Sequence, residues 1–80
     1  MNMSNPMKKE ITDLALAAYL SATGHDLISV SPIGKKTAFS FLRTDELNQR
    51  ILDFYNRRAT VDPLKYAETL RNLKAMAIRY

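Results

Sequence analysis

The stretch LISVSPIGKKTAFSFL, residues 27–42, decides the fold. Apolar residues, most of them β-branched or aromatic, alternate in it with serine, threonine and alanine, which is the two-residue period of a half-buried strand. Proline and glycine interrupt the pattern at 32–35, and both are typical turn residues. The sequence therefore predicts an antiparallel β-hairpin with strands at 27–31 and 36–42.

The register of this hairpin follows from which side chains must be buried together. A four-residue loop lets Ile28 and Val30 lie on the same face as Phe39 and Phe41 of the opposite strand. A two-residue loop would force Ile33 to a positive φ, which a β-branched residue resists, so we expect the longer loop. Because a lone hairpin is marginally stable in water, helices must cover its apolar face.

A first helix is predicted before the hairpin. Thr12 can cap it, Asp13 favours the positive end of its dipole, and a dense run of alanine and leucine follows. Gly24 is expected to end the helix in the left-handed conformation. Leu16 and Leu20, with the small alanines around them, form a broad apolar face that a sheet or a helix can approach closely.

Two further helices are predicted after the hairpin. Thr44 caps one that begins at Asp45 and stops near Arg57, where basic residues suit the negative end of the dipole. Asp62 as N-cap and Pro63 at the first helical position give the last helix a clear start. The connection between the two helices is expected to be tight, which makes them antiparallel or sharply angled neighbours.

Together these elements predict a single small α+β domain of order α-β-β-α-α, an antiparallel β-hairpin packed on one face by three helices. Residues 1–11 show no period that could bury a face, so we expect a flexible N-terminal tail followed by a domain at 12–80. The expected core consists of large apolar side chains from every element: Leu16, Leu20, Ile28, Val30, Phe39, Phe41, Leu47, Ile51, Phe54, Leu70 and Leu73.

Composition excludes several kinds of chemistry. The 80 residues contain no cysteine, so disulfides, thiol catalysis and thiolate metal sites are out of reach. The one histidine, His25, follows the first predicted helix, where it can hydrogen-bond a last carbonyl group, and no second histidine completes a metal site. The two glycines form no phosphate-binding loop. We therefore expect a protein that is not an enzyme and has no cofactor, no metal and no small-molecule substrate.

The sequence also predicts a soluble, cytoplasmic protein with no membrane partner. No segment approaches the roughly 18 apolar residues that span a bilayer. The apolar run at 14–20 follows Lys8 and Lys9 as in a secretory signal, but Glu10 and Asp13 interrupt the transition.

The basic excess gives the main functional hypothesis. The net charge is +4, and most of the excess lies in the hairpin region and in the segment from residue 62 onward. Such cations can contact the phosphates of a DNA or RNA backbone, and no row of base-reading side chains is evident. The alternative interpretation is that they only keep a small surface soluble and protect a strand edge. The predicted nucleic-acid-binding residues are Lys35, Lys36, Arg43, Arg57, Arg58, Lys65 and Arg71.

The end of the last helix carries more apolar surface than one buried stripe needs. This excess favours a partner contact through Ala75, Met76, Ile78 and Tyr80. The alternative function is accordingly a protein–protein interaction module, either a homodimer or an inhibitor or subunit of a larger complex.

Several stretches resemble a family of short uncharacterised prokaryotic and phage-associated domains of unknown function. They are LAAYL at 16–20 with Gly24 and His25 after it, FSF at 39–41, FYN at 54–56 and VDPLKYAETLRNLKAM at 61–76. The resemblance covers about residues 13–79 and implies a compact domain in a microbial or mobile-element setting, with no active site. The preferred function is therefore a small nucleic-acid-associated accessory protein of a prokaryote or phage that binds mainly through phosphate contacts.

Overall fold

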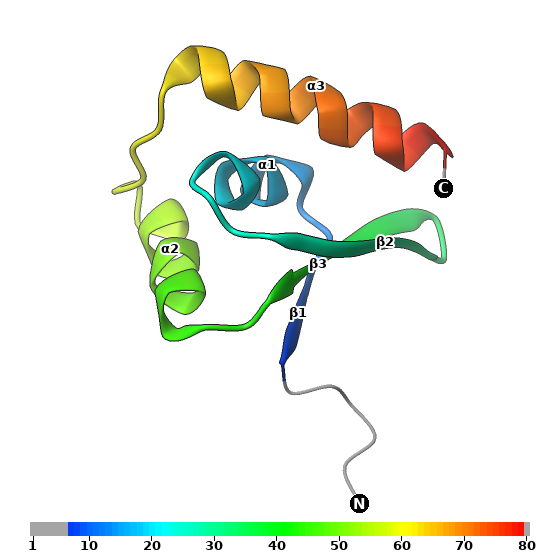
Figure 1. Ribbon diagram of the computed structural model, residues 1–80, viewed down its shortest axis with the longest axis horizontal. Helices are drawn as coiled ribbons and strands as arrows, with labels where there is room; N and C mark the ends of the chain where they lie inside the picture. The colour runs from blue at the N-terminus through cyan, green and yellow to red at the C-terminus, as the bar shows by residue number, and fades with distance from the viewer. Residues whose placement is uncertain (1–6, 80) are drawn as a thin grey trace, which may run out of the picture.

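The computed structural model describes residues 7–79, which form three strands and three helices (Figure 1). The predicted α+β class is confirmed, with one added strand, so the order is β-α-β-β-α-α. The elements are β1 (Lys8–Ile11), α1 (Leu14–Ala22), β2 (Leu27–Ile33), β3 (Lys36–Leu42), α2 (Asp45–Tyr55) and α3 (Pro63–Arg79).

The added strand, β1, makes the sheet three-stranded and antiparallel, in the order β1-β3-β2. The prediction of a tail is therefore wrong for residues 8–11, because they pair with β3 and Ile11 is only 5% exposed. Three of these four residues are charged, and a strand that joins an existing hairpin through backbone hydrogen bonds needs little apolar pattern of its own. The other predicted tail residues at 1–6 lie outside the described residues.

The turn between β2 and β3 is shorter than predicted. Ile33 pairs with Lys36, which leaves Gly34 and Lys35 as a two-residue loop. Gly34 has a φ of 60°, so glycine supplies the positive φ at the first loop position, as in a type II′ turn. The expected four-residue loop is wrong because Ile33 belongs to the strand and needs no unusual φ.

Ile28 is exposed, although the sequence predicts it in the core. Irregular pairing next to this residue places Leu27 opposite Phe41 and Val30 opposite Phe39. Leu27 and Val30 both pack against the core, whereas Ile28 is 47% exposed. A β-bulge of this kind inserts one extra residue and so changes which side chains share a face.

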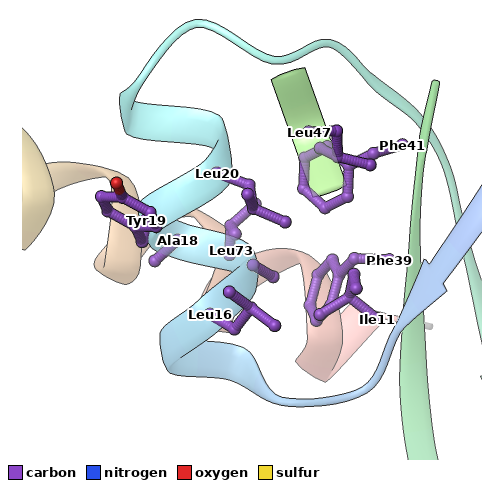
Figure 2. Packing of buried hydrophobic residues seen from close by; sticks show 10 residues of the cluster. Ile11, Leu16, Ala18, Tyr19, Leu20, Phe39, Phe41, Leu47 and Leu73 are labelled. Atoms are coloured by element: carbon purple, nitrogen blue, oxygen red, sulfur yellow. The ribbon is translucent and has the colours of Figure 1, made fainter. Parts of the chain in front are cut away.

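The rest of the predicted core is buried or half-buried. Six of the predicted residues are nearly inaccessible: Leu16, Leu20, Phe39, Phe41, Leu47 and Leu73. Four more are half-buried and pack against them: Val30, Ile51, Phe54 and Leu70. Figure 2 shows how Leu16 and Leu20 of α1 face Phe39 and Phe41 of β3 and Leu47 of α2.

The ends of α1 are fixed by local hydrogen bonds. Its N-cap is Asp13 and not Thr12, since the Asp13 carboxylate accepts from the amides of Ala15 and Leu16 at 3.0 and 3.3 Å. Gly24, at a φ of 97°, ends the helix as predicted. The amides of Gly24 and His25 donate to the carbonyl groups of Ser21 and Leu20, which is the Schellman motif.

The helices cover one side of the sheet, with α1 between the sheet and α3 and with α2 beside it (Figure 1). Because α1 is enclosed in this way, Ala17 and Ala18 are fully buried along with Leu16 and Leu20. The Tyr66 hydroxyl of α3 donates to the Ala15 carbonyl group of α1 at 3.3 Å. Among the described residues, no helix has both the length and the apolar character needed to cross a membrane.

Candidate nucleic-acid interface

The predicted phosphate-binding side chains are accessible. All seven of them are exposed. Within residues 7–79 the one ion pair joins Arg50 to Glu46 at 3.5 Å, and it involves none of the seven. Their charges are therefore uncompensated by direct acidic partners and are available to an anion from solution.

The structure places these cations in separate regions. Lys35 and Lys36 lie at the tip of the β2–β3 hairpin, which in Figure 1 points toward the same end of the molecule as the C-terminus of α3. Arg57 and Arg58 lie at the opposite end, where the chain leaves α2. Since the longest dimension of the molecule is 41 Å, one compact basic patch does not form from all seven.

We call Arg57, Arg58 and Lys65 the corner cations, because they lie on the α2–α3 connection and on the first turn of α3. Arg57 has a φ of 60°, the left-handed region that glycine normally occupies. The amides of Arg57 and Arg58 donate to the carbonyl groups of Phe54 and Asp53 at 3.2 and 2.8 Å. This second Schellman motif ends α2 with an arginine at the position where glycine is preferred.

The geometry of this corner differs from that of a helix-turn-helix motif. Thr44 and Asp62 cap α2 and α3 as predicted, with hydrogen bonds to Leu47 and Lys65 amides at 3.0 and 3.1 Å. The connection, however, runs from residue 56 to 62 and is longer than the predicted tight turn or the turn of three or four residues in that motif. In addition, α2 and α3 pack mainly against α1 and not against one another.

The remaining predicted cations are Arg43 and Arg71. Arg43 follows β3, and its amide donates to the Met7 carbonyl group at 2.6 Å, which places it at the β1 side of the sheet. Arg71 lies in the middle of α3, two residues from the buried Leu73 and on a different face of the helix. Neither residue joins the hairpin tip.

Two cations that were not predicted to bind nucleic acid are held in place by the sheet. Lys8 and Lys9 belong to β1 and lie opposite Leu42 and Phe41 of β3. Their assignment to a flexible tail concealed this placement. The signal that could have found them is Ile11, a large apolar residue whose position two residues after Lys9 fits the strand period.

Arg50 is the cation most engaged by the fold. The hydroxyl of the buried Tyr19 raises the pKa of Arg50, and attraction to Glu46 adds to this effect, while desolvation of the guanidinium acts in the opposite direction. The ring of Tyr19 lies 5.7 Å from that of Phe54, so the same tyrosine also joins α1 to α2. Arg50 is thus held by its neighbours, unlike the seven predicted cations.

The predicted partner surface on α3 is exposed but divided. Ile78 is 86% exposed, Met76 is 37% exposed and Ala75 is exposed, while Tyr80 lies outside the described residues. Residues two apart on a helix point in nearly opposite directions, so Met76 and Ile78 lie on different faces. Leu64, 80% exposed and fourteen residues before Ile78, shares the outer face with it.

An open cleft lies between β1 and α2. Its volume is about 240 Å³, below the roughly 300 Å³ at which small-molecule sites begin. The lining residues are Lys9, Glu10, Ile11, Thr12, Asp13, Leu16, Ile51 and Tyr55. This size suits an inserted side chain better than a bound metabolite.

At His25 the backbone, and not the imidazole, makes the contact with the end of α1. Its backbone amide donates to the Leu20 carbonyl group at 3.1 Å, whereas its Nε2 atom is buried without a hydrogen-bond partner. Within the part of the chain that the structure describes, no three histidine, cysteine, aspartate or glutamate side chains are placed to hold a metal ion.

These features define a small α+β domain in which a three-stranded antiparallel sheet is covered on one side by three helices. The model of a domain family matches residues 8–79, and the chain therefore belongs to that family, described as a domain of unknown function (DUF5659). The resemblance to a family of short domains of unknown function is thus confirmed. No curated protein and no solved structure matches the chain.

Proposed function

We propose that this protein is a small, non-enzymatic, nucleic-acid-associated accessory protein of a prokaryote or phage. It binds mainly through contacts between its cations and backbone phosphates. The observation that carries the proposal is that all seven predicted cations are exposed and that none forms an ion pair with an acid among residues 7–79. When surface cations neutralise phosphates, the counterions that were condensed on the nucleic acid are released. This release is the main source of sequence-independent affinity.

The conformation of Arg57 supports the corner cations as part of the binding surface. A non-glycine residue in the left-handed region costs roughly 1 kcal/mol or more. Such strain collects at functional sites, where the side chain is needed in a defined place. An arginine at this position, followed by Arg58, presents two guanidinium groups at the exposed end of α2.

The separation of the cations favours backbone contact over base reading. The hairpin tip and the corner lie toward opposite ends of a molecule 41 Å long, comparable with one turn of duplex, about 34–36 Å. A duplex can therefore meet cations from more than one region along its backbone. Because no recognition helix is formed, the expected affinity depends weakly on sequence.

The test is a salt titration of binding to a labelled duplex of about 20 base pairs and to a single strand of the same length, followed by fluorescence anisotropy. The slope of log K against log salt is negative, and the variant Lys35→Ala/Lys36→Ala should make it less negative by about 2. The variant Arg57→Ala/Arg58→Ala should change it by a similar amount. The matched control Lys35→Arg/Lys36→Arg keeps both charges and should leave the slope unchanged. Absence of binding near 50 mM salt would contradict the proposal.

A second candidate function is protein–protein interaction through the outer face of α3. The exposure of Ile78 and Leu64 supports it, since the two large apolar side chains share one face of the helix, where they can contact the same partner. Light scattering at rising concentration should then show self-association that Ile78→Glu removes. Glu68→Gln, an exposed polar change on the same helix, serves as the control.

A further inference from the structure

The two edges of the sheet differ in how well they are protected against another strand. On β2, Pro32 has no amide to donate, and the pairing is irregular between Leu27 and Ser29. Proline and bulges are standard protection for an edge strand. On β1 neither device is present, and its protection consists of its short length of four residues and the charges of Lys8, Lys9 and Glu10.

The register shows which backbone groups of β1 point outward. The Arg43 amide donates to the Met7 carbonyl group, so this pair is a hydrogen-bonded one. Hydrogen-bonded and non-hydrogen-bonded pairs alternate along an antiparallel ladder. Lys9 and Ile11 therefore direct their amide and carbonyl groups toward β3, while Lys8 and Glu10 direct theirs toward the open edge.

From this geometry we infer that β1 pairs with β1 of a second copy of the chain. A two-fold axis through Lys9 brings Lys8 of each copy opposite Glu10 of the other. These are the two residues whose backbone groups face outward, so each Lys8–Glu10 pair exchanges both of its backbone hydrogen bonds. The two sheets then form one continuous sheet in which the helices of both copies lie on the same side.

The charges of β1 favour this register and favour a second copy of the chain as the partner. Lys8 and Glu10 lie on one face of β1, and directly opposed residues of opposite charge stabilise a strand pair. Shifting the two-fold axis by one residue would remove both Lys8–Glu10 pairs and would still oppose like charges, Lys8 to Lys8 or Glu10 to Glu10. The edge is therefore complementary to itself. Lys9 meets Lys9 at the axis, where its long side chain can carry its charge out to solvent.

The apolar side of β1 fits the same arrangement. The pairing brings Met7, 57% exposed, opposite Ile11 of the second copy. Ile11 lines the cleft together with Ile51 and Tyr55, and Tyr55 is 60% exposed. A methionine side chain is flexible and suits an irregular apolar cleft of this size.

The experiment is sedimentation of the full chain over concentrations from about 10 µM to 1 mM, because so short an interface gives a weak dimer. Glu10→Lys and Lys8→Glu should each weaken the dimer about tenfold or more, since every substitution acts at both symmetric pairs. The double variant Lys8→Glu/Glu10→Lys should restore dimerisation to within about threefold. Lys74→Glu, the same charge reversal at an exposed site on α3, should have no effect.

Hydrogen exchange of the unmodified protein gives a second readout that does not depend on variants. The amides of Lys8 and Glu10 should be protected at high concentration and exchange freely at low concentration. A strict monomer up to about 1 mM overturns the inference. A dimer that tolerates both single charge reversals, or that fails to recover in the double variant, also overturns it. A dimer that is disrupted by Ile78→Glu and not by the β1 variants overturns it too.

Discussion

Replacing Arg57 by glycine should make the protein more stable and a weaker ligand for nucleic acid. Arg57 ends α2 with a φ of 60°, and it is exposed. A left-handed conformation costs an L-residue roughly 1–2 kcal/mol, which glycine does not incur. Glycine in turn gains roughly 0.5–1 kcal/mol of entropy in the unfolded chain. The difference lies between about 0 and 1.5 kcal/mol, and we expect a stabilisation near its middle, about 0.5–1 kcal/mol.

Urea denaturation and thermal unfolding measure this change. For a domain of this size, about 1 kcal/mol corresponds to a rise of roughly 4–8 °C in Tm, so we expect about 2–8 °C with an unchanged m-value. Arg58→Gly is the matched control, because Arg58 has no positive φ and its replacement should leave stability unchanged or slightly lower it.

The same variant should lose affinity for duplex at low salt, since it removes one phosphate-binding charge. A variant that is more stable and binds less well is the expected signature of strain retained for function. If Arg57→Gly were no more stable than the unmodified protein, the assignment of strain to this residue would be refuted.

Three further substitutions test the packing, each by urea denaturation. Gly24→Ala should destabilise by about 1–2 kcal/mol, because its φ of 97° is strained for alanine although nothing lies within 4 Å of an added Cβ; a neutral result would contradict the Schellman end of α1. Leu73→Ala should cost about 2–5 kcal/mol, since Leu73 is 3% exposed and joins α3 to the core; a loss under about 1 kcal/mol would show that α3 is loosely attached. Ile28→Thr should change stability by less than about 0.5 kcal/mol, whereas a large loss would mean that the bulge does not turn Ile28 outward.

Local signals in the sequence predicted the helices well. The caps at Thr44 and Asp62 and the glycine end at Gly24 involve contacts within a few residues of one another. Such hydrogen bonds depend on side-chain type and spacing, both of which can be read directly from a sequence. The same holds for the strand period that located Phe39 and Phe41.

The errors concern pairing between segments that are distant in sequence. β1 forms by pairing with the edge of β3 that β2 leaves open. The residues of β1 are mostly charged and do not reveal this pairing. The outward turn of Ile28 depends on a bulge set by both strands, and the two-residue turn depends on Gly34 and not on Ile33. These features follow from the match between two strands, which a one-dimensional pattern does not specify.

The exposure of the candidate cations was predictable from the sequence, but their arrangement was not. All seven predicted cations are exposed, as charged residues usually are. Their separation follows from the packed fold, in which the β2–β3 hairpin tip and the α2–α3 connection lie toward opposite ends of the molecule (Figure 1). The left-handed conformation of Arg57 gave no sequence signal, because arginine is an unusual residue in that role.

The salt dependence of duplex binding by the unmodified chain decides whether this protein binds phosphates. If exposed, unpaired cations bind phosphates, the slope of log K against log salt should lie between about −2.5 and −6, which corresponds to about three to seven phosphate contacts. A slope near zero, or no binding at about 50 mM salt, would show that these cations serve only to keep the surface soluble.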